Sequence, residues 1–359
     1  MKKLHAVYIV FILASLVLTA FVVPGQVVAG PQSTGEKQGR GGECLGTAED
    51  AIVDLDCREV TIAIENAYLP FNYIDEATGE AGGWDYDAWE EICTRLHCTP
   101  VFVEAAWEGM IQAVADGQYD AAADGITITP DRDEIVDFSV GYVAIEQRLL
   151  VRIDETRINS IEDIVNSAPS GAISVNQILI AAVIAVLAIA AILFAERYVA
   201  ASSRGMFRWV GVALVLIVLV GYSVWPRQSC PTLALGTQTG TTNYETASQY
   251  LPAACIQAFE QFPFAVQALI AGDIDAVIID ETAGQGYLGA NAEDLKLVGP
   301  SLSSDQLGFI FPPGSNLIDP VNQALESMMD DGRLNELNAI YFGSDFNCDY
   351  TDTGITCGS

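Results

Sequence analysis

Three polar segments of this 359-residue chain follow short apolar segments, and they contain residue types that bind small charged molecules. Residues 124–129 read Asp-Gly-Ile-Thr-Ile-Thr, residues 236–242 read Gly-Thr-Gln-Thr-Gly-Thr-Thr, and Asp280 follows the apolar residues 276–279. Carboxylates, hydroxyls and the N–H groups of glycine-rich turns can pair with ammonium and carboxylate groups. These segments are therefore the candidates for a binding site.

The sequence gives little support for catalysis. Its only histidines are His5 and His97, and His5 lies in the N-terminal segment. It contains no phosphate-binding Gly-Lys motif and no Gly-x-Ser-x-Gly motif. We therefore expect neither an enzyme nor a cofactor.

The eight cysteines lie outside the long apolar runs and fall into pairs of sequence neighbours, as in compartments where disulfides persist. Zinc binding is the alternative, but no Cys-x-x-Cys motif is present, and we expect no metal. Sequence proximity suggests the pairs Cys44–Cys57, Cys93–Cys98, Cys230–Cys255 and Cys348–Cys357.

The chain is strongly acidic, with 47 acidic and 16 basic residues and a formal charge of −31 at pH 7. This charge argues against nucleic acid and anionic lipid as partners of the part outside the apolar runs. It fits a protein that stays dissolved in a crowded or saline exterior and attracts cationic ligands weakly. Solubility alone is a sufficient explanation of the charge.

Three long apolar runs indicate targeting to a membrane. Residues 6–23 follow Met1-Lys2-Lys3 and precede small residues near Ala29, which predicts a secretory signal or an uncleaved anchor. Residues 178–195 and 209–225 each approach the length that spans hydrocarbon as a helix, with a buried core helix as the alternative.

The loop between the two internal runs sets the expected topology. It contains Arg197, Arg204 and Arg208, a clear positive-inside signal in a chain with so few basic residues. We therefore expect residues 30–174 and 226–359 to lie together on the extracytoplasmic side, periplasmic or at the cell surface, where they can build one folded unit.

Strand and helix patterns alternate on both sides of the apolar runs. We expect strands at 58–64, 100–103, 119–123, 232–235, 256–259, 275–279, 295–298 and 307–311. We expect helices at 85–96, 107–115, 130–135, 243–250, 264–271, 317–330 and 332–341. This alternation predicts parallel sheets covered by helices, with a ligand crevice at the carboxyl ends of the strands.

Several motifs, in this order, resemble the family 3 extracellular solute-binding proteins, which bind polar amino acids for ABC importers. The ligand-binding core of ionotropic glutamate receptors is similar. The resemblance covers about residues 59–343 without the apolar runs. Its motifs are Ala-Tyr-Leu-Pro-Phe at 67–71, Gly-Trp-Asp at 83–85, residues 120–132, Phe-Ser at 138–139, Gly-Thr-Thr at 240–242, residues 272–280, Asp-Gly at 331–332 and Tyr-Phe-Gly at 341–343.

The resemblance implies an α/β protein with the two-lobed periplasmic-binding-protein type II fold. Here a two-helix transmembrane hairpin would be inserted in lobe 2. The expected divisions are a signal peptide or anchor at 1–29, a spacer at 30–56, lobe 1 at 57–143 and 303–345, lobe 2 at 147–170 and 230–298, the hairpin at 175–226 and a C-terminal tail at 346–359.

The resemblance also implies a free amino acid as ligand, whose two charges need partners when they leave water. Arg132 corresponds to the family's carboxylate-binding arginine, whose planar fork grips both oxygens. The N–H of Gly125 and the hydroxyl and N–H of Thr127 would add donors. Asp280 corresponds to the ammonium-binding acid, although a helix N-cap is an alternative role for it.

Thr241 and Thr242 lie at a strand-to-helix turn, where unpaired N–H groups favour anions. The resemblance directs this turn at the ligand's carboxylate or side chain, and Gln238 is a weaker candidate for the same pocket.

Tyr68 and Trp84 match the family's aromatic walls, with core packing as the alternative role. Glu65 matches an acid that reads the ligand's side chain, which would favour a cationic or amide side chain. Asp124 adds negative charge, but the sequence does not assign it a position.

We expect the chain to bind an amino acid by lobe closure, as the membrane-tethered component of an amino-acid ABC transporter with an ABC permease as partner. The alternative is a glutamate-receptor-like sensor or ligand-gated channel that uses the hairpin. The loop at 196–208 is too short for a pore helix and filter, which favours the transporter component.

Overall fold

The computed structural model of the protein describes residues 42–75, 78–169, 230–291, 293–343, 347–351 and 354–358. The expected signal segment and the apolar runs at 178–195 and 209–225 lie outside these residues, and so does the expected hairpin. In the described part of the chain, no helix has the length and apolar character needed to cross a membrane.

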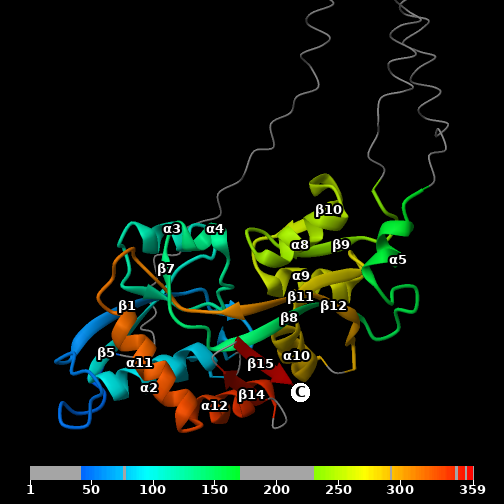
Figure 1. Ribbon diagram of the computed structural model, residues 1–359. Helices are drawn as coiled ribbons and strands as arrows, with labels where there is room; N and C mark the ends of the chain where they lie inside the picture. Colours follow the sequence, from blue (N-terminus) through cyan, green and yellow to red (C-terminus); the bar gives the residue numbers. More distant parts are fainter. Residues whose placement is uncertain are drawn as a thin grey trace, which may run out of the picture. The chain divides into compact units, whose positions relative to one another are not determined.

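The first sheet has the strand order β5-β1-β6-β13-β7. Its strands are β1 (Arg58–Ile64), β5 (Cys98–Glu104), β6 (Ala121–Ala122), β7 (Asp137–Phe138) and β13 (Ile310–Phe311). Strand β1 pairs in parallel with β5 and β6, whereas β13 pairs antiparallel with β6 and β7. We call this sheet, with its helices, lobe 1 (Figure 1). The helices are α2 (Trp84–Leu96), α3 (Met110–Ala115), α4 (Pro130–Asp133), α11 (Ile318–Asp330) and α12 (Arg333–Phe342).

The second sheet has the order β10-β9-β11-β8-β12. Its strands are β8 (Val143–Arg152), β9 (Leu235–Gln238), β10 (Ile256–Phe259), β11 (Ala276–Asp280) and β12 (Leu295–Leu307). We call it lobe 2, together with its helices α5 (Ile161–Asn166), α8 (Thr242–Tyr250), α9 (Phe262–Ala271) and α10 (Glu281–Ala290) and the 3-10 helix η3 (Ala253–Cys255). The expected parallel pairing is present between β9 and its neighbours β10 and β11, but β8 runs antiparallel to both β11 and β12.

Two long strands connect the lobes. The strands β8 and β12 pair from Val143 opposite Leu307 to Arg152 opposite Leu295, with an irregularity between Val298 and Ser303. Figure 1 shows them passing side by side between the lobes. Because the chain crosses here in two adjacent segments, this pair is the natural hinge for a closing motion.

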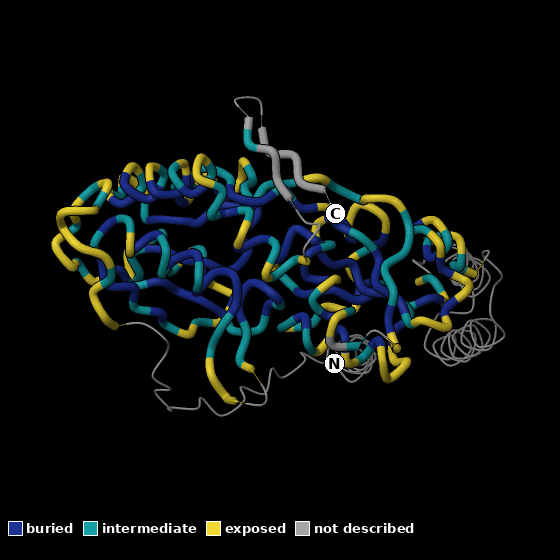
Figure 2. Tube along the Cα trace, turned by 90° about the horizontal axis from the view of Figure 1, so that it is seen from below, coloured by how far each residue is buried: buried dark blue, intermediate teal, exposed yellow. Residues whose placement is uncertain are grey.

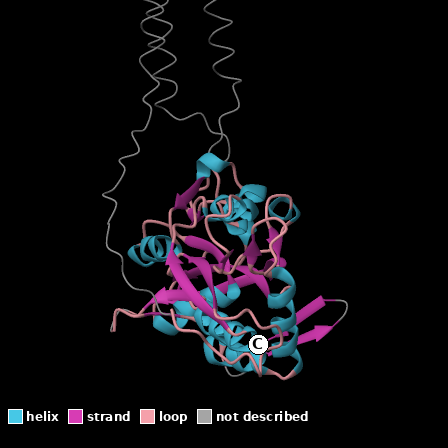
Figure 3. Cartoon of the chain, turned by 90° about the vertical axis from the view of Figure 1, so that its left-hand side faces the viewer, coloured by secondary structure: helices cyan, strands magenta, loops and turns pink. Residues whose placement is uncertain are grey.

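The core of lobe 1 forms where α2 covers the sheet. Ala88, Ile92 and Leu96 recur every four residues along this helix, so they share one face and are fully buried. Figure 2 shows that buried segments form the interior of the described chain, and Figure 3 shows helices packed around the strands. The helical spacing read from the sequence therefore corresponds to real burial.

Two small sheets lie outside the strands expected from the sequence. One contains β2 (Ala67–Tyr68), β3 (Asn72–Ile74) and β4 (Ala81–Gly82) in an antiparallel arrangement. The other is a hairpin of β14 (Asn347–Thr351) and β15 (Gly354–Gly358), within the expected C-terminal tail. The Tyr350 hydroxyl donates to the Tyr142 carbonyl oxygen at 3.0 Å, which fastens this hairpin to the segment just before β8.

Three of the four expected disulfides are confirmed. They are Cys44–Cys57, Cys93–Cys98 and Cys230–Cys255, with Cα–Cα distances of 5.2, 4.6 and 5.1 Å. In the backbone register of β14 and β15, Cys348 lies opposite Cys357, and their bond remains a prediction.

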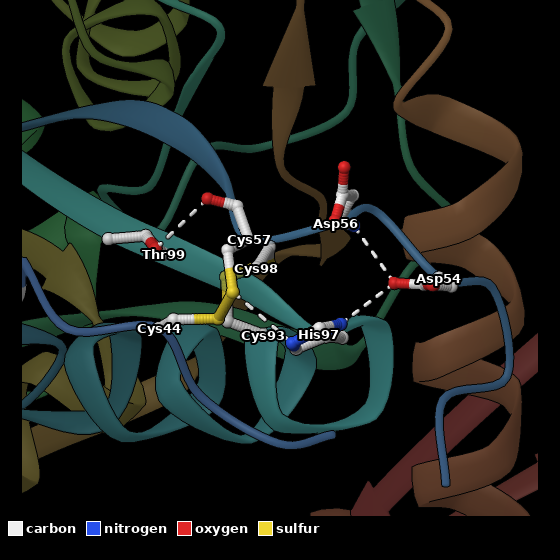
Figure 4. The surroundings of a disulfide bond; sticks show 8 residues. All are labelled: Cys44, Asp54, Asp56, Cys57, Cys93, His97, Cys98 and Thr99. Carbon is white, nitrogen blue, oxygen red and sulfur yellow. Dashed lines mark hydrogen bonds and ion pairs between the residues drawn. A yellow bond between two sulfur atoms is a disulfide. The ribbon is translucent and has the colours of Figure 1, made fainter. Parts of the chain in front are cut away.

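The first disulfide closes the segment before β1 into a loop, and this loop packs beside the end of α2 (Figure 4). His97, just past the helix, places Nε2 3.2 Å from Cys57 Sγ, and its Nδ1 lies 2.8 Å from Asp54 Oδ1. The N–H of Leu55 donates to Leu96 O at 2.9 Å. The second half of the expected spacer is therefore part of lobe 1, not a linker.

Substitution of Trp84 tests the packing of the lobe 1 core. Its indole is fully buried and stacks on Tyr142 with ring centroids 4.6 Å apart. Its Nε1 donates to Asn338 Oδ1 at 2.9 Å. Trp84→Ala should lower the free energy of unfolding by about 3–5 kcal/mol in urea denaturation, since it removes a large buried side chain. Ile340→Ala is the control, because Ile340 is 64% exposed, and it should change stability by less than about 0.5 kcal/mol. Equal effects of the two substitutions would contradict this account of the core.

Candidate ligand-binding site

A small cavity lies between the two lobes. From lobe 1 it is lined by Glu65, Tyr68, Trp107, Asp124, Gly125, Thr127 and Arg132. From lobe 2 it is lined by Gln238, Thr241, Thr242, Asn243, Phe262 and Asp280. Every ligand-binding candidate from the sequence except Trp84 is in this set.

Strand ends position most of these side chains. Glu65 follows β1 directly, Asp124 follows β6 closely, and Gln238 and Asp280 are the last residues of β9 and β11. These strands are parallel within each sheet, so their carboxyl ends meet at one edge. This is the crevice that the alternation of strands and helices predicts.

Arg132 is the cation of the cavity and is only 9% exposed. It lies on α4, which the Thr129 hydroxyl caps by accepting from the Arg132 N–H at 3.3 Å. Its Nη1 donates to Thr127 O at 2.9 Å, and its guanidinium carbon lies 5.3 Å from the centre of the Trp107 ring. In the described chain, Thr127 O is the only atom that accepts a hydrogen bond from the Arg132 side chain. The guanidinium therefore retains donors for an anion.

Burial lowers the pKa of Arg132, because a charged group loses hydration in the interior. The carboxylates of Glu245, Asp280 and Asp305 act in the opposite direction and favour the charged form. An anion bound beside Arg132 would favour that form further.

Asp280 is the principal acid on the lobe 2 side and is 2% exposed. Its Oδ1 accepts from Asn243 Nδ2 at 3.1 Å, and its Oδ2 accepts from the Tyr68 hydroxyl. It occupies the N-cap position of α10 but makes no capping hydrogen bond, which weakens the alternative role as a helix cap. Burial raises the pKa of Asp280 to about 6, so a neighbouring cation would stabilise its ionised form.

The two threonines at the start of α8 have different roles. The Thr241 hydroxyl caps the helix by accepting from the Tyr244 N–H at 3.2 Å, and it donates to Gln238 O at 2.8 Å. The Thr242 hydroxyl accepts from Gln147 Nε2 at 3.0 Å. Thr242 is therefore the better placed of the two to contact a ligand through its hydroxyl.

Polar side chains bridge the lobes around the cavity, which places the two walls in a closed arrangement. The bridging pairs are Thr127 Oγ1 with Thr242 Oγ1 at 3.2 Å, Glu65 with Gln238 Nε2 at 3.2 and 3.3 Å, and Tyr68 with Asp280. A ligand between these groups would contact both lobes at once.

Gly125 is required by the shape of the cavity wall. Its φ is +54°, and a Cβ there would lie 2.5 Å from the Tyr68 ring, so no larger residue fits without a shift. Its N–H lies near the Asp85 carboxyl group and counteracts the rise in the pKa of Asp85. The role of this N–H as a donor to the ligand remains a prediction.

The structure places Trp84 in the lobe 1 core and Trp107 at the cavity, so the expectation that Trp84 forms an aromatic wall is wrong. Trp84 begins α2, and its ring faces inward onto Tyr142. Trp107 follows the carboxyl end of β5, at the same sheet edge as Glu65. The position of Trp107 just after a strand is the signal in the sequence that could identify it as a cavity residue, whereas the family-like motif around Trp84 points to Trp84 instead. Sequence reasoning also missed Asn243 and Phe262.

A network of buried acids supports the lobe 1 wall. Asn72 Nδ2 donates to Asp124 Oδ1 at 2.7 Å and to Asp85 Oδ2 at 3.0 Å, so one amide bridges two carboxyl groups. Burial raises the pKa of Glu65 and of Asp124, and the charge of Glu65 raises that of Asp124 further. Burial also raises the pKa of Asp85 to about 7.

The sequence model of the family described as bacterial extracellular solute-binding proteins, family 3, matches residues 60–344. The L-cystine-binding protein TcyA of Bacillus subtilis is 21% identical over 288 residues, 80% of this chain and 82% of that protein. The octopine-binding periplasmic protein of Rhizobium meliloti is 31% identical over 87 residues, 24% of this chain and 29% of that protein. The L-arginine-binding protein of Pseudomonas aeruginosa is 30% identical over 95 residues, 26% of this chain and 36% of that protein.

Solved structures show the same fold. An ancestral arginine-binding protein bound to arginine superposes with a TM-score of 0.58 at 23% identity, covering 79% of this chain and 98% of that protein. A binding component of an ABC transporter from Wolinella succinogenes, complexed with lysine, gives a TM-score of 0.57 at 20% identity, covering 79% and 95%. The two-lobed α/β architecture is thus the one expected from the sequence.

Asp85 should make stability depend on pH. Its pKa is about 7 in the folded protein and 3.8 for an ordinary Asp, so the folded state binds more protons between these values. Stability from this group is therefore lost as the pH rises. Between pH 5 and pH 8 the free energy of unfolding of the wild type should decrease. That of Asp85→Asn should decrease by a smaller amount, and the difference between the two should be about 2–3 kcal/mol. Parallel declines, measured by urea denaturation, would contradict the assignment.

Proposed function

Because the chain belongs to family 3 of the bacterial extracellular solute-binding proteins, we propose that it binds a free amino acid in the cavity between its lobes. The observation that carries this proposal is the pair of opposite buried charges, Arg132 and Asp280, on one small cavity. A zwitterion has the two complementary charges, so it can satisfy both residues.

Arg132 would bind the α-carboxylate, since its guanidinium retains donors and a planar fork matches two carboxylate oxygens. The Thr127 and Thr242 hydroxyls, 3.2 Å apart, would add donors beside it. Asp280 would bind the α-ammonium, with the amide oxygen of Asn243 as a second acceptor. That oxygen is buried and has no hydrogen-bond partner within the described chain.

Capture would proceed by lobe closure about β8 and β12. Arg132 and Thr127 come from lobe 1, whereas Asp280 and Thr242 come from lobe 2, so one ligand contacts both walls only when they are close. A ligand favours the conformation in which it makes more contacts, so it would favour the closed state. Trp107 and Tyr68 would form the aromatic walls around its aliphatic stem.

The ligand's side chain is expected to be polar or cationic. Glu65, at 5% exposure, adds a carboxylate to the cavity, and Gln238 adds an amide. An acidic side chain would meet like charge there, whereas a cation or an amide would find acceptors. The names of the relatives, which include binders of arginine, octopine and cystine, agree with this class.

The partner would be an ABC permease, as the family relationship suggests. The apolar runs at 178–195 and 209–225, with three arginines between them, would tether the lobes to the membrane on its extracytoplasmic side. We propose binding and delivery without a catalytic step, because the family is one of solute-binding proteins.

Calorimetry with the twenty amino acids should identify at least one ligand with micromolar or tighter affinity. Arg132→Ala should then weaken its binding by about 2–5 kcal/mol, or at least ~30-fold, because the ligand carboxylate loses its buried partner. Arg333→Ala is the matched control, since Arg333 lies on α12 and pairs with Glu91 and Glu336, and it should leave the affinity unchanged. Equal effects of the two variants, or no binding by any amino acid, would refute the proposal.

Asp280 should make the affinity for an amino acid with an uncharged side chain depend on pH. The ammonium binds the ionised carboxylate, whose pKa is about 6 before binding, so affinity should fall as the pH drops through 6. Asp280→Asn should bind weakly and lose this component of the pH dependence between pH 5 and pH 8. An unchanged pH profile in the variant would exclude Asp280 as the ammonium partner.

A further inference from the structure

The disulfide Cys44–Cys57 has a histidine side chain directly beside it (Figure 4). His97 Nε2 lies 3.2 Å from Cys57 Sγ. The two sulfur atoms and one ring nitrogen of His97 all lie within 4.8 Å of one another. Thiolate sulfur and imidazole nitrogen are ligands that Zn²⁺ binds in proteins. The side chains of a metal site are therefore already together, but sulfurs bonded to each other are not thiolates and cannot act as ligands.

This disulfide is the most accessible of the three that the structure describes. Both residues of Cys44–Cys57 are exposed, whereas both residues of Cys93–Cys98 are fully buried. In Cys230–Cys255 one residue is exposed and the other is half-buried. His97, the only histidine among the described residues, belongs to the other lobe. A reductant in solution therefore reaches Cys44–Cys57 most readily, and only this pair has an imidazole beside it in the described chain.

Asp54 sets the orientation of the imidazole. His97 Nδ1 lies 2.8 Å from Asp54 Oδ1, and an ionised carboxylate only accepts hydrogen bonds. The proton of the neutral ring is therefore on Nδ1, which leaves the lone pair of Nε2 directed toward Cys57 Sγ. The Asp56 N–H donates to the same Asp54 oxygen at 2.9 Å and holds the carboxylate in place. Zinc-binding histidines have this arrangement, in which the other ring nitrogen donates to a carboxylate.

Backbone hydrogen bonds hold the two cysteines beside His97 independently of the S–S bond. The Cys57 N–H donates to His97 O at 2.9 Å. On the other side, the N–H of Leu45, the residue after Cys44, donates to Cys98 O at 2.9 Å. Cys98 is one half of the buried disulfide, so the segment that accepts both hydrogen bonds stays fixed. Opening of the exposed disulfide would therefore leave both thiols next to the imidazole.

We propose that this site binds Zn²⁺ after a dithiol reductant opens the exposed disulfide, with Cys44 Sγ, Cys57 Sγ and His97 Nε2 as ligands. A thiolate of the reductant attacks one sulfur, forms a mixed disulfide with it and releases the other sulfur as a thiolate. The second thiolate of the reductant then breaks the mixed disulfide. The dithiol is oxidised to its own disulfide, and the cysteine pair gains two electrons. Zn²⁺ binds both thiolates and the imidazole, and any thiol protons pass to solvent.

The metal requires only a small rearrangement of the side chains. Zn–S bonds are about 2.3 Å long, so two sulfurs of a tetrahedral site lie about 3.8 Å apart. The Cα atoms of Cys44 and Cys57 are 5.2 Å apart, and rotation about the two Cα–Cβ bonds can separate the sulfurs without moving the backbone. The exposed position leaves the fourth coordination place to water. Thiolate ligands favour Zn²⁺ over Mg²⁺ and Ca²⁺, which prefer oxygen.

The test begins with reduction of the full-length protein by dithiothreitol without denaturant. After removal of the reductant under anaerobic conditions, iodoacetamide labels free thiols, and peptide mass spectrometry locates them. We expect labelling of Cys44 and Cys57 but not of Cys93 and Cys98. Zn²⁺ added before iodoacetamide should slow the labelling of the exposed pair at least ~10-fold, because a metal-bound thiolate is a poor nucleophile. A chelator should restore the rate.

Co²⁺ reports which atoms bind the metal, because thiolate ligands produce a charge-transfer absorption that carboxylate ligands do not. The reduced protein should bind one Co²⁺ with this absorption, and Zn²⁺ should displace it. The oxidised protein should not produce the absorption at any Co²⁺ concentration. This comparison excludes weak binding to the many surface carboxylates of the acidic chain.

Three variants separate the roles of the residues. His97→Asn suits the left-handed φ of 50° and removes the imidazole, so it should weaken Zn²⁺ binding to the reduced protein at least ~30-fold. Asp54→Asn should weaken it about 10-fold, with no change in the labelling rate when Zn²⁺ is absent. Asp50→Asn is the control, because this exposed carboxylate of the same loop bonds to Thr47, and it should change neither quantity.

The wild type alone decides the outcome, so no variant has to fold. The inference is wrong if dithiothreitol leaves the exposed disulfide intact, or if Zn²⁺ does not protect the two reduced thiols. Equal Zn²⁺ affinity of the oxidised and reduced proteins would also overturn it. Cys44, Cys57 and His97 do not line the cavity between the lobes, so this result is independent of amino-acid binding.

Discussion

The site depends on two buried groups of opposite charge, a guanidinium and a carboxylate, that line one cavity. A buried guanidinium and a buried carboxylate each lose hydration, and burial accordingly lowers the pKa of Arg132 and raises that of Asp280. The protein partly offsets this cost with Tyr68 and Asn243, which donate to Asp280, and with Thr127 O, which accepts from Arg132. A zwitterion supplies the missing counter-charges to both residues, which is why this arrangement favours an amino acid.

The two sheets place the charged residues on the two walls of the cavity, and these walls can close on a ligand. The parallel strands β1 and β6 end at the cavity in lobe 1, and β9 and β11 end there in lobe 2. Because β8 and β12 join the lobes in two adjacent crossings, the walls can rotate without unfolding either sheet. The disulfides lie away from the cavity and brace the individual lobes, so they need not restrict this motion.

Much of the site could be predicted because strand ends and turn residues are local features of the sequence. Arg132, Asp280, Thr127 and Thr242 all lie at such positions and line the cavity. The direction in which a side chain points at a turn depends on tertiary packing. The sequence motif therefore points to Trp84 rather than Trp107 as the cavity residue. The strand β8 was missed because Glu146, Gln147 and Arg148 interrupt its apolar pattern. The position of Asp124 follows only from the register of β1 with β6, which the sequence does not reveal.

A crystal structure of the protein with a bound amino acid would test the central claim most directly. The account predicts that the ligand's α-carboxylate lies within hydrogen-bond distance of the Arg132 guanidinium and that its α-ammonium lies within hydrogen-bond distance of the Asp280 carboxylate. A ligand bound outside this cavity, or one whose charged groups contact neither residue, would contradict it.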